Sequence, residues 1–217
     1  MEIRLAKTAG FCFGVNRAVK LAYDLLDEGR KVATLGPLIH NPQVVNDLQK
    51  RGAVTCNDVD DVPDGYEVVI RSHGVPETVY EKIQTRGLAF HDATCPFVAK
   101  IHKIAAEAGK NGAVLLVAGD RTHPEVEGIV GHATGPVVVF AGLSELEEWA
   151  SKNEPQKSIY VVAQTTFRVE SWEACKSFLK KWCTNPKIFD TICSATWTRQ
   201  QEAEDLSQKC DHMIVIG

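Results

Sequence analysis

Short, continuously apolar runs alternate along the chain with longer segments in which apolar residues recur every three or four positions. Runs of this length that are rich in β-branched residues predict strands buried on both faces of a sheet, and the segments between them predict amphipathic helices. The alternation therefore predicts an α/β fold with parallel sheets. The predicted strands lie in residues 32–36, 66–72, 113–119, 136–142, 158–164 and 212–217.

The pattern repeats around three cysteines, Cys12, Cys95 and Cys193. Each is followed by a helical segment and then by a predicted strand, and the helical segments are residues 15–29, 97–112 and 196–210. Each of these strands ends in a glycine 24 residues after its cysteine, at Gly36, Gly119 and Gly217. An internal repeat of this kind predicts quasi-repeated structural modules.

Polar side chains keep the same register. His40 and His123 each lie 28 residues after their cysteine, and an aspartate stands three residues before Cys95 and before Cys193. His73 and Thr165 follow later strands at comparable places. We therefore predict tandem α/β modules at residues 1–94 and 95–192, with residues 193–217 as the opening of an incomplete third module. The strand ends of these modules are expected to face a shared crevice.

Charge and composition limit the class of partner. The chain has 24 basic and 28 acidic residues in a length of 217 and no long run of either sign, so nothing favours nucleic acid or a membrane surface. The N-terminus lacks the apolar core of a signal peptide, and no stretch approaches the ~20 apolar residues of a spanning helix. We expect a cytoplasmic protein with a small-molecule substrate and no structural disulfides among its seven cysteines.

The three repeated cysteines are candidates for a metal site. Each stands just before a predicted helix, where free N–H groups and the helix dipole favour a thiolate. The gaps of 83 and 98 residues do not match the close pairs of zinc sites or ferredoxins, so the site must be assembled by tertiary structure. A cubane held by three cysteines would leave one iron open as a Lewis acid, but spacing alone leaves both iron and zinc possible.

The polar set around the strand ends suits phosphate oxygens. It consists of His40, His73, His123 and Thr165, and the chain has neither a P-loop nor a dinucleotide fingerprint. Ordinary structural interpretations remain for residues outside the repeat. The histidines outside it are expected to be surface or satisfied core residues, and the remaining cysteines to be buried hydrophobes; these are His91, His102, His132, His212, Cys56, Cys175, Cys183 and Cys210. Glu125, two residues after His123, is equally compatible with an acid and with a helix N-terminal carboxylate.

Several long motifs resemble one known family, the 4-hydroxy-3-methylbut-2-enyl diphosphate reductases (IspH/LytB) of the non-mevalonate isoprenoid pathway. In order along essentially the whole chain, they are AGFCFGVNRAV, GPLIHNPQVV, RSHGVP, DATCPFV, THPEVEG, AQTTF and TICSATWTRQ.

The resemblance implies a cloverleaf-like α/β enzyme with a central [4Fe-4S] cluster. It implies that Cys12, Cys95 and Cys193 are the cluster ligands and that Glu125 is the proton source. It further implies that His40, His73, His123 and Thr165 contact the substrate diphosphate and hydroxyl. The implied reaction is reductive dehydroxylation to isopentenyl and dimethylallyl diphosphate, with ferredoxin or flavodoxin as the electron donor.

The family's third module continues past the position of Gly217, so the resemblance also implies that most of this module is missing from the chain. Two functions follow as alternatives. One is the reductase, for which the three cysteines, the histidines and Glu125 are the sequence signature. The other is an inactive or regulatory cluster-binding fragment, for which the missing module is the argument.

Overall fold

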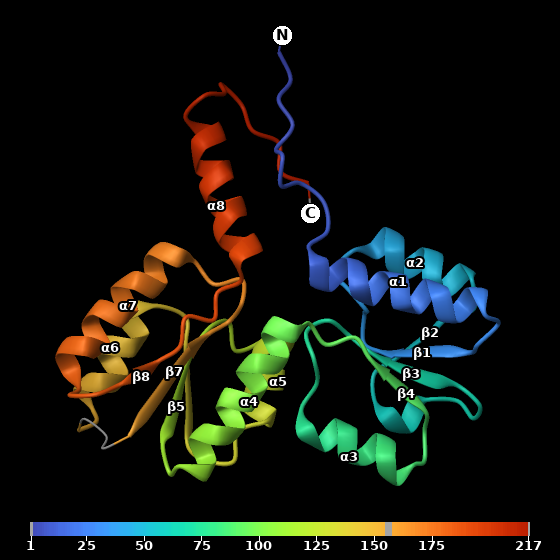
Figure 1. Cartoon of the computed structure of the whole chain (residues 1–217), viewed down its shortest axis with the longest axis horizontal. Helices are drawn as coiled ribbons and strands as arrows, with labels where there is room; N and C mark the ends of the chain where they lie inside the picture. The colour runs from blue at the N-terminus through green and yellow to red at the C-terminus, as the bar shows by residue number, and fades with distance from the viewer. Residues whose placement is uncertain (1, 155–157, 217) are drawn as a thin grey trace.

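The computed structural model describes residues 2–154 and 158–216, which contain two separate parallel sheets (Figure 1). The first sheet has the strand order β2-β1-β3-β4. Its strands are β1 (Val32–Leu35), β2 (Val54–Cys56), β3 (Glu67–Ile70) and β4 (Phe90–Asp92). The β1 strand is buried along its whole length, as its run of apolar residues predicts.

The second sheet repeats this topology, with the strand order β6-β5-β7-β8 and parallel pairing throughout. Its strands are β5 (Val114–Ala118), β6 (Val137–Phe140), β7 (Ile159–Ala163) and β8 (Lys187–Ile188). The prediction of quasi-repeated α/β modules with parallel sheets is confirmed. The module boundaries at residues 94/95 and 192/193 stay predictions.

Helices cover both faces of each sheet (Figure 1). In the first module, α1 (Phe13–Asp27) and α2 (Pro42–Lys50) cover one face, and the short 3-10 helix η1 (Val59–Asp61) and α3 (Glu77–Thr85) cover the other. In the second, α4 (Pro96–Lys110) and α5 (Pro124–Gly131) lie opposite α6 (Leu143–Ser151) and α7 (Val169–Trp182).

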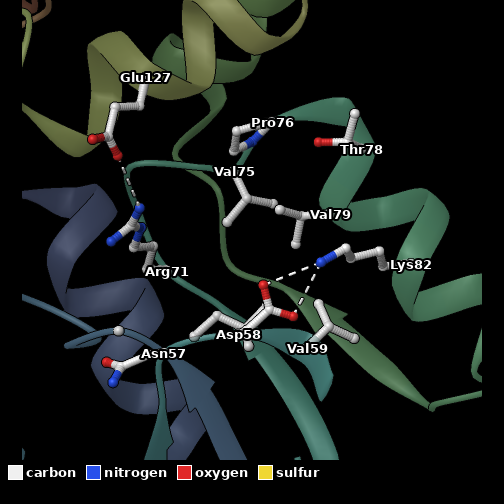
Figure 2. A pocket seen from close by; sticks show the side chains of 12 residues that line it. Asn57, Asp58, Val59, Arg71, Val75, Pro76, Thr78, Val79, Lys82 and Glu127 are labelled. Atoms are coloured by element: carbon white, nitrogen blue, oxygen red, sulfur yellow. Dashed lines mark hydrogen bonds and ion pairs between the residues drawn. The ribbon is translucent and has the colours of Figure 1, made fainter. Parts of the chain in front are cut away.

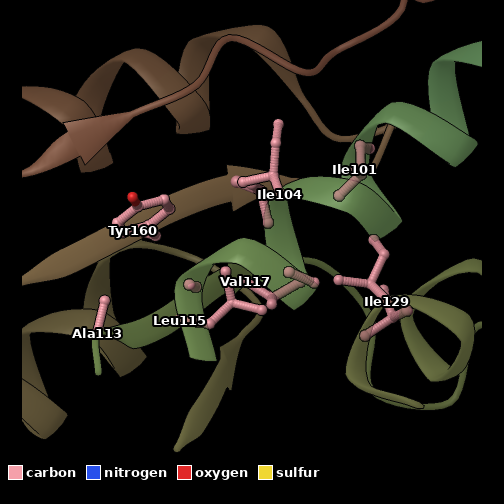
Figure 3. Close-up of a cluster of buried hydrophobic side chains, with 11 residues drawn as sticks. Ile101, Ile104, Ala113, Leu115, Val117, Ile129 and Tyr160 are labelled. Carbon is pink, nitrogen blue, oxygen red and sulfur yellow. The ribbon is translucent and has the colours of Figure 1, made fainter. Parts of the chain in front are cut away.

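The core beneath α4 and α5 is the part of the second module nearest the first (Figure 1). Figure 3 shows Ile104, Leu115, Val117, Ile129 and Tyr160 meeting in this cluster. Burial of each large aliphatic side chain contributes about 1.5–3 kcal/mol, so the position of α5 on the sheet is fixed by apolar packing. The helix contacts α3 of the first module with its other side.

The last described segment differs from the prediction in two places. The helix α8 (Ser194–Ser207) ends before residue 210. Cys210 therefore lies beyond the helix end and is partly exposed, not buried as expected. Residues 212–216 form no strand, and Met213 and Ile214 are 44% and 88% exposed. A strand exists only through hydrogen bonds to a neighbour, and no described strand lies beside this segment. Gly217 lies outside the described residues.

The start of α2 generates a stability prediction. The Asn41 side chain accepts a hydrogen bond from the Val44 N–H at 3.0 Å, and Pro42 occupies the first helical turn. Asn41→Ala should lower the free energy of unfolding by about 1 kcal/mol, because it removes the N-cap. Urea unfolding measures the change. Asn57→Ala is the control, since Asn57 is exposed and caps no helix, and it should change stability by less than about 0.5 kcal/mol. Equal effects of the two substitutions would contradict the capping role.

Candidate functional site

Three helices begin directly after the three repeated cysteines. Cys12, Cys95 and Cys193 are the N-cap residues of α1, α4 and α8. Each has an extended backbone, so its side chain stands beside the free N–H groups of the first helical turn. The repeat seen in the sequence therefore places one thiol at the start of a helix in each of three segments.

The thiols of these residues share one region. The Cys95 thiol senses the charges of both Cys12 and Cys193, and burial raises its pKa. The N–H groups of Phe97 and Val98 lower that pKa, but the burial outweighs them. The N–H groups at the helix start thus favour the Cys95 thiolate, as expected, but burial opposes them more strongly. Crowded, buried thiols lose their protons when a metal supplies positive charge.

Gly14 makes the approach of Cys12 and Cys95 possible, and the sequence analysis missed it. A Cβ atom at Gly14 would lie 2.7 Å from the Cys95 sulfur, so α1 contacts the second module through bare backbone. A glycine two residues after the cysteine, inside an otherwise strong helical segment, was the available signal.

The three histidines and the three cysteines differ in how closely their potential ligand atoms lie together. A single tetrahedral zinc with bonds of about 2.3 Å needs sulfurs about 3.8 Å apart. Among the described residues, the set of three ligand atoms that all lie within 4.8 Å of one another consists of imidazoles and not of these thiols.

Polar contacts attach α8 to the segment before Cys12. Arg199 donates from Nε to the Thr8 carbonyl at 3.1 Å and from Nη2 to the Gly10 carbonyl at 2.6 Å. Glu202 accepts from the backbone N–H groups of Lys7 and Thr8 and from the Thr8 hydroxyl. These contacts hold the helix that starts at Cys193 beside the chain that leads to Cys12.

Three histidines form a second cluster, between the two sheets. His40 follows β1, His73 lies in the turn after β3, and His123 is the N-cap of α5 after β5. Their ring centroids are 4.7, 5.4 and 5.6 Å apart. The two residues with the 28-residue spacing thus meet across the module boundary, at the carboxyl ends of parallel strands.

Burial keeps two of these rings neutral at pH 7. It lowers the pKa of His73 to about 3, with smaller contributions from His40, His123 and Arg71. The pKa of His123 is also lowered, chiefly by burial. His123 Nδ1 accepts the Glu125 N–H at 3.1 Å, so the proton of the neutral ring resides on Nε2. His73 Nδ1 is buried and has no hydrogen-bond partner in the described chain.

Glu125 is a buried carboxylic acid beside this cluster. It is 2% exposed, and its two oxygens accept the Thr165 backbone N–H and pair with the Thr165 hydroxyl, both at 2.6 Å. Burial raises the pKa of Glu125, and the bonds from Thr165 only partly oppose that shift. Thr165 therefore lies on the carboxyl group and not in the histidine cluster.

A cavity of about 450 Å³ lies over the ends of β1 and β3, and none of the three histidines lines it. Arg71 lines it and points toward Glu127 of α5, 3.9 Å away (Figure 2). The Arg71 Nε also donates to the Gly74 carbonyl at 3.4 Å, which braces the turn that carries His73. Arg71 precedes this histidine by two residues, but no periodicity in the sequence identified it.

The histidines outside the repeat mostly have partners. His91 contacts Glu67 at 2.7 Å, and His132 contacts the Val75 carbonyl and Glu77, both at 3.0 Å. His212 is exposed. His102 is the exception, because it is buried and its Nε2 lacks a partner in the described chain. Cys56, Cys175 and Cys183 are buried, as expected.

The duplicated parallel sheets, with thiols at helix starts and imidazoles at strand ends, define a tandem α/β protein whose candidate ligands come from more than one module. The family model described as LytB protein matches residues 3–217. The 4-hydroxy-3-methylbut-2-enyl diphosphate reductase of Clostridioides difficile (strain 630) is 41% identical over the whole chain, which covers 77% of that protein. The reductase of Geobacter sulfurreducens is 43% identical, with 75% of its length covered.

Solved structures agree with these relatives. The chain is similar to a structure of (E)-4-hydroxy-3-methyl-but-2-enyl diphosphate reductase, with a TM-score of 0.79 and 38% identity over 99% of this chain and 76% of the other. The Plasmodium falciparum reductase gives a TM-score of 0.85 at 28% identity, over 93% of this chain and 64% of its own. The chain belongs to the LytB family of 4-hydroxy-3-methylbut-2-enyl diphosphate reductases. No described helix combines the length and apolarity that a membrane crossing requires.

The lowered pKa of His73 generates a titration prediction. The folded protein should hold this ring neutral from pH 7 down to pH 5, because its pKa is about 3. Between pH 6.5 and about 3 the unfolded chain binds the extra proton, so the contribution of His73 to stability is present above this window and is lost as the pH falls through it. NMR of the ring nitrogens measures the titration. A midpoint near 6.5 for His73 would contradict the burial argument.

Proposed function

We propose that this chain reduces 4-hydroxy-3-methylbut-2-enyl diphosphate, with a [4Fe-4S] cluster on Cys12, Cys95 and Cys193. Two electrons and two protons enter, the allylic C–O bond breaks, a C–H bond forms, and water leaves. The products are isopentenyl and dimethylallyl diphosphate. The names of the relatives favour this function over a regulatory cluster-binding fragment, since those cited are reductases.

The cysteine set supports the cluster by its chemistry. Three partly buried thiols at helix starts offer soft anionic ligands once a metal offsets the burial that raises the pKa of Cys95. When bound, the cluster relays single electrons and supplies a Lewis-acidic iron. Gly14 keeps the ligands of the first and second modules within reach of one another.

The histidine cluster supports the diphosphate position. Neutral imidazoles donate hydrogen bonds to phosphate oxygens, and His123 carries its ring proton on Nε2 because Nδ1 is occupied by the Glu125 N–H. The unpaired Nδ1 of His73 is a buried polar atom that a ligand would satisfy. An anion beside these rings also favours their protonated forms, so binding would strengthen as the rings gain charge.

The buried carboxyl group of Glu125 is the observation that carries the proposal. Its raised pKa keeps a proton on the side chain at a higher pH than an exposed glutamate would allow. Thr165 receives this proton, because its hydroxyl is 2.6 Å from a carboxyl oxygen of Glu125. Thr165 passes it to the departing hydroxyl of the substrate, while the bond from the Glu125 N–H orients His123 at the diphosphate.

The electron donor belongs to the same proposal. Ferredoxin or flavodoxin delivers electrons singly, as a cluster requires, whereas a nicotinamide delivers a hydride. Such donors and the substrate place the reaction in the cytoplasm.

The direct test is reconstitution. The protein is loaded anaerobically with iron and sulfide, given the diphosphate substrate and a chemical one-electron donor, and the two products are measured by mass spectrometry. Product formation that requires the loaded protein supports the reductase. A fully loaded protein that leaves the substrate unchanged would overturn the proposal for this chain.

Glu125→Gln should reduce turnover by ~10² or more, because the amide cannot donate a carboxylic proton. Binding of inorganic pyrophosphate should change little, since Glu125 touches Thr165 and the His123 ring through bonds that glutamine retains in part. Steady-state kinetics and calorimetry measure the two quantities. Glu147→Gln, on the exposed side of α6, is the control. A parallel loss of binding and turnover would make Glu125 a structural residue.

Cys95→Ser should abolish retention of iron and sulfide, because a serine oxygen is a poor replacement for a soft thiolate ligand. Cys175→Ser is the control, because Cys175 is buried in the apolar core of the second module and stands at no helix start. Iron and acid-labile sulfide per chain, measured after gel filtration, provide the comparison. A Cys95→Ser protein that holds as much iron as the wild type would exclude this cysteine as a ligand.

A further inference from the structure

His102 on α4 is a buried histidine with an unexplained polar atom. The residue is 6% exposed, and its Nε2 has no hydrogen-bond partner within the described chain. Burial lowers its pKa to about 3, so the ring is neutral at pH 7. Leaving a buried polar atom unpaired costs about 1–3 kcal/mol, which makes a purely structural histidine here a poor choice for stability.

The His102 ring packs closely against two glycines that belong to different modules. A Cβ atom at Gly74 would lie 2.4 Å from His102 Cε1, and one at Gly128 would lie 3.1 Å from His102 Nε2. Gly74 directly follows His73 in the first module, and Gly128 lies on α5 one helical turn after Glu125. Bare backbone from both modules therefore contacts the Cε1–Nε2 edge of the imidazole.

Neighbouring contacts fix the same junction. His132, at the end of α5, stacks on His102 with centroids 4.1 Å apart and an interplanar angle of 24°. Its Nε2 donates to the Val75 carbonyl, one residue beyond Gly74. A Cβ atom at Gly131 would lie 2.4 Å from Pro76 Cβ, so residues 73–76 lie directly on the glycine face of α5.

We propose that His102 is a positioning residue that fixes where the His73 turn sits on α5, because its ring contacts Gly74 of the turn and Gly128 of the helix. His73 belongs to the turn, and His123 and Glu125 belong to the start of α5. The edge of the imidazole that both glycines contact therefore determines the position of His73 relative to His123 across the module boundary. This inference rests on the proposed function only where it assigns the resulting geometry to diphosphate binding.

Substitutions at His102 and at Gly128, which contact each other, should have coupled effects on the histidine cluster. His102→Ala removes the imidazole ring that contacts Gly74 and Gly128. Gly128→Ala places a methyl group against that ring. Each substitution alone should therefore disturb the histidine cluster. In the double variant the new methyl group occupies part of the vacated space. Residues in contact show such non-additive coupling, whereas independent sites do not.

The experiment measures binding of inorganic pyrophosphate by calorimetry, together with ring-proton NOEs between His73 and His123 and thermal unfolding. His102→Ala and Gly128→Ala should each weaken pyrophosphate binding about tenfold or more, which is about 1.4 kcal/mol, and each should change the NOE intensity from its wild-type value, because each alters the contact that positions His73. The double variant should recover at least half of the lost binding. His212→Ala, which removes an exposed histidine, should match the wild type.

The outcomes separate the two proposals. If the wild type fails to bind pyrophosphate, the diphosphate site is wrong, and the NOE still tests the spacing. If both single variants keep wild-type NOEs, or if the double variant is as impaired as the sum of the singles, the positioning role is overturned. If His102→Ala does not fold, Gly128→Ala and His102→Leu replace it. Each should weaken pyrophosphate binding, because leucine fills a similar volume but lacks the planar ring.

Discussion

Close approach of bare backbone across the module boundary is the constraint on which the site depends. The two sheets have separate cores, so groups from both can meet only where few side chains intervene. Gly14 lets α1 approach the Cys95 sulfur, and Gly74 and Gly128 both contact the Cε1–Nε2 edge of His102. A Cβ atom at any of these glycines would lie 2.4–3.1 Å from its neighbour, closer than ordinary packing permits. Glycine at these positions is thus a geometric requirement of the shared site.

Burial gives the resting site its electrical character. It lowers the pKa of His73 and raises the pKa values of Glu125 and Cys95, so all three groups shift toward their uncharged forms. Uncharged groups cost less to hold in a poorly solvated junction. Under the proposed function, such a site would gain charge when a metal cluster binds at the thiols and a diphosphate binds at the imidazoles. Arg71 adds a fixed positive charge whose effect reaches His73 and His123.

The two clusters are held by different kinds of contact. The histidine junction is supported by the apolar core under α4 and α5 and by the close packing of α5 against residues 73–76. The cysteine junction depends on polar links from α8, in which no residue is buried. Arg199 and Glu202 bond to residues 7–10, and Gln200 bonds to the backbone at Phe167 and Val169. The position of Cys193 relative to Cys12 therefore depends on hydrogen bonds between segments far apart in the sequence.

The sequence by itself determined the repeat, the helices that follow its cysteines and the five longest of the described strands. Apolar runs and helical periodicity report local burial, and the equal offsets of Cys12 and Cys95 from Gly36 and Gly119 reflect two modules with one topology. It also marked His40, His73 and His123, because residues at the ends of parallel strands share an edge. Only the tertiary structure decided the rest. Thr165 bonds to Glu125, burial outweighs the helix start at Cys95, and residues 212–216 form no strand. His102 was expected to be a surface histidine or a core histidine with hydrogen-bond partners. Its Nε2 has no such partner in the described chain, and its ring contacts glycines of two modules. Pairing, desolvation and clearance depend on which surfaces meet, and periodicity within one segment carries no information about its neighbour from another.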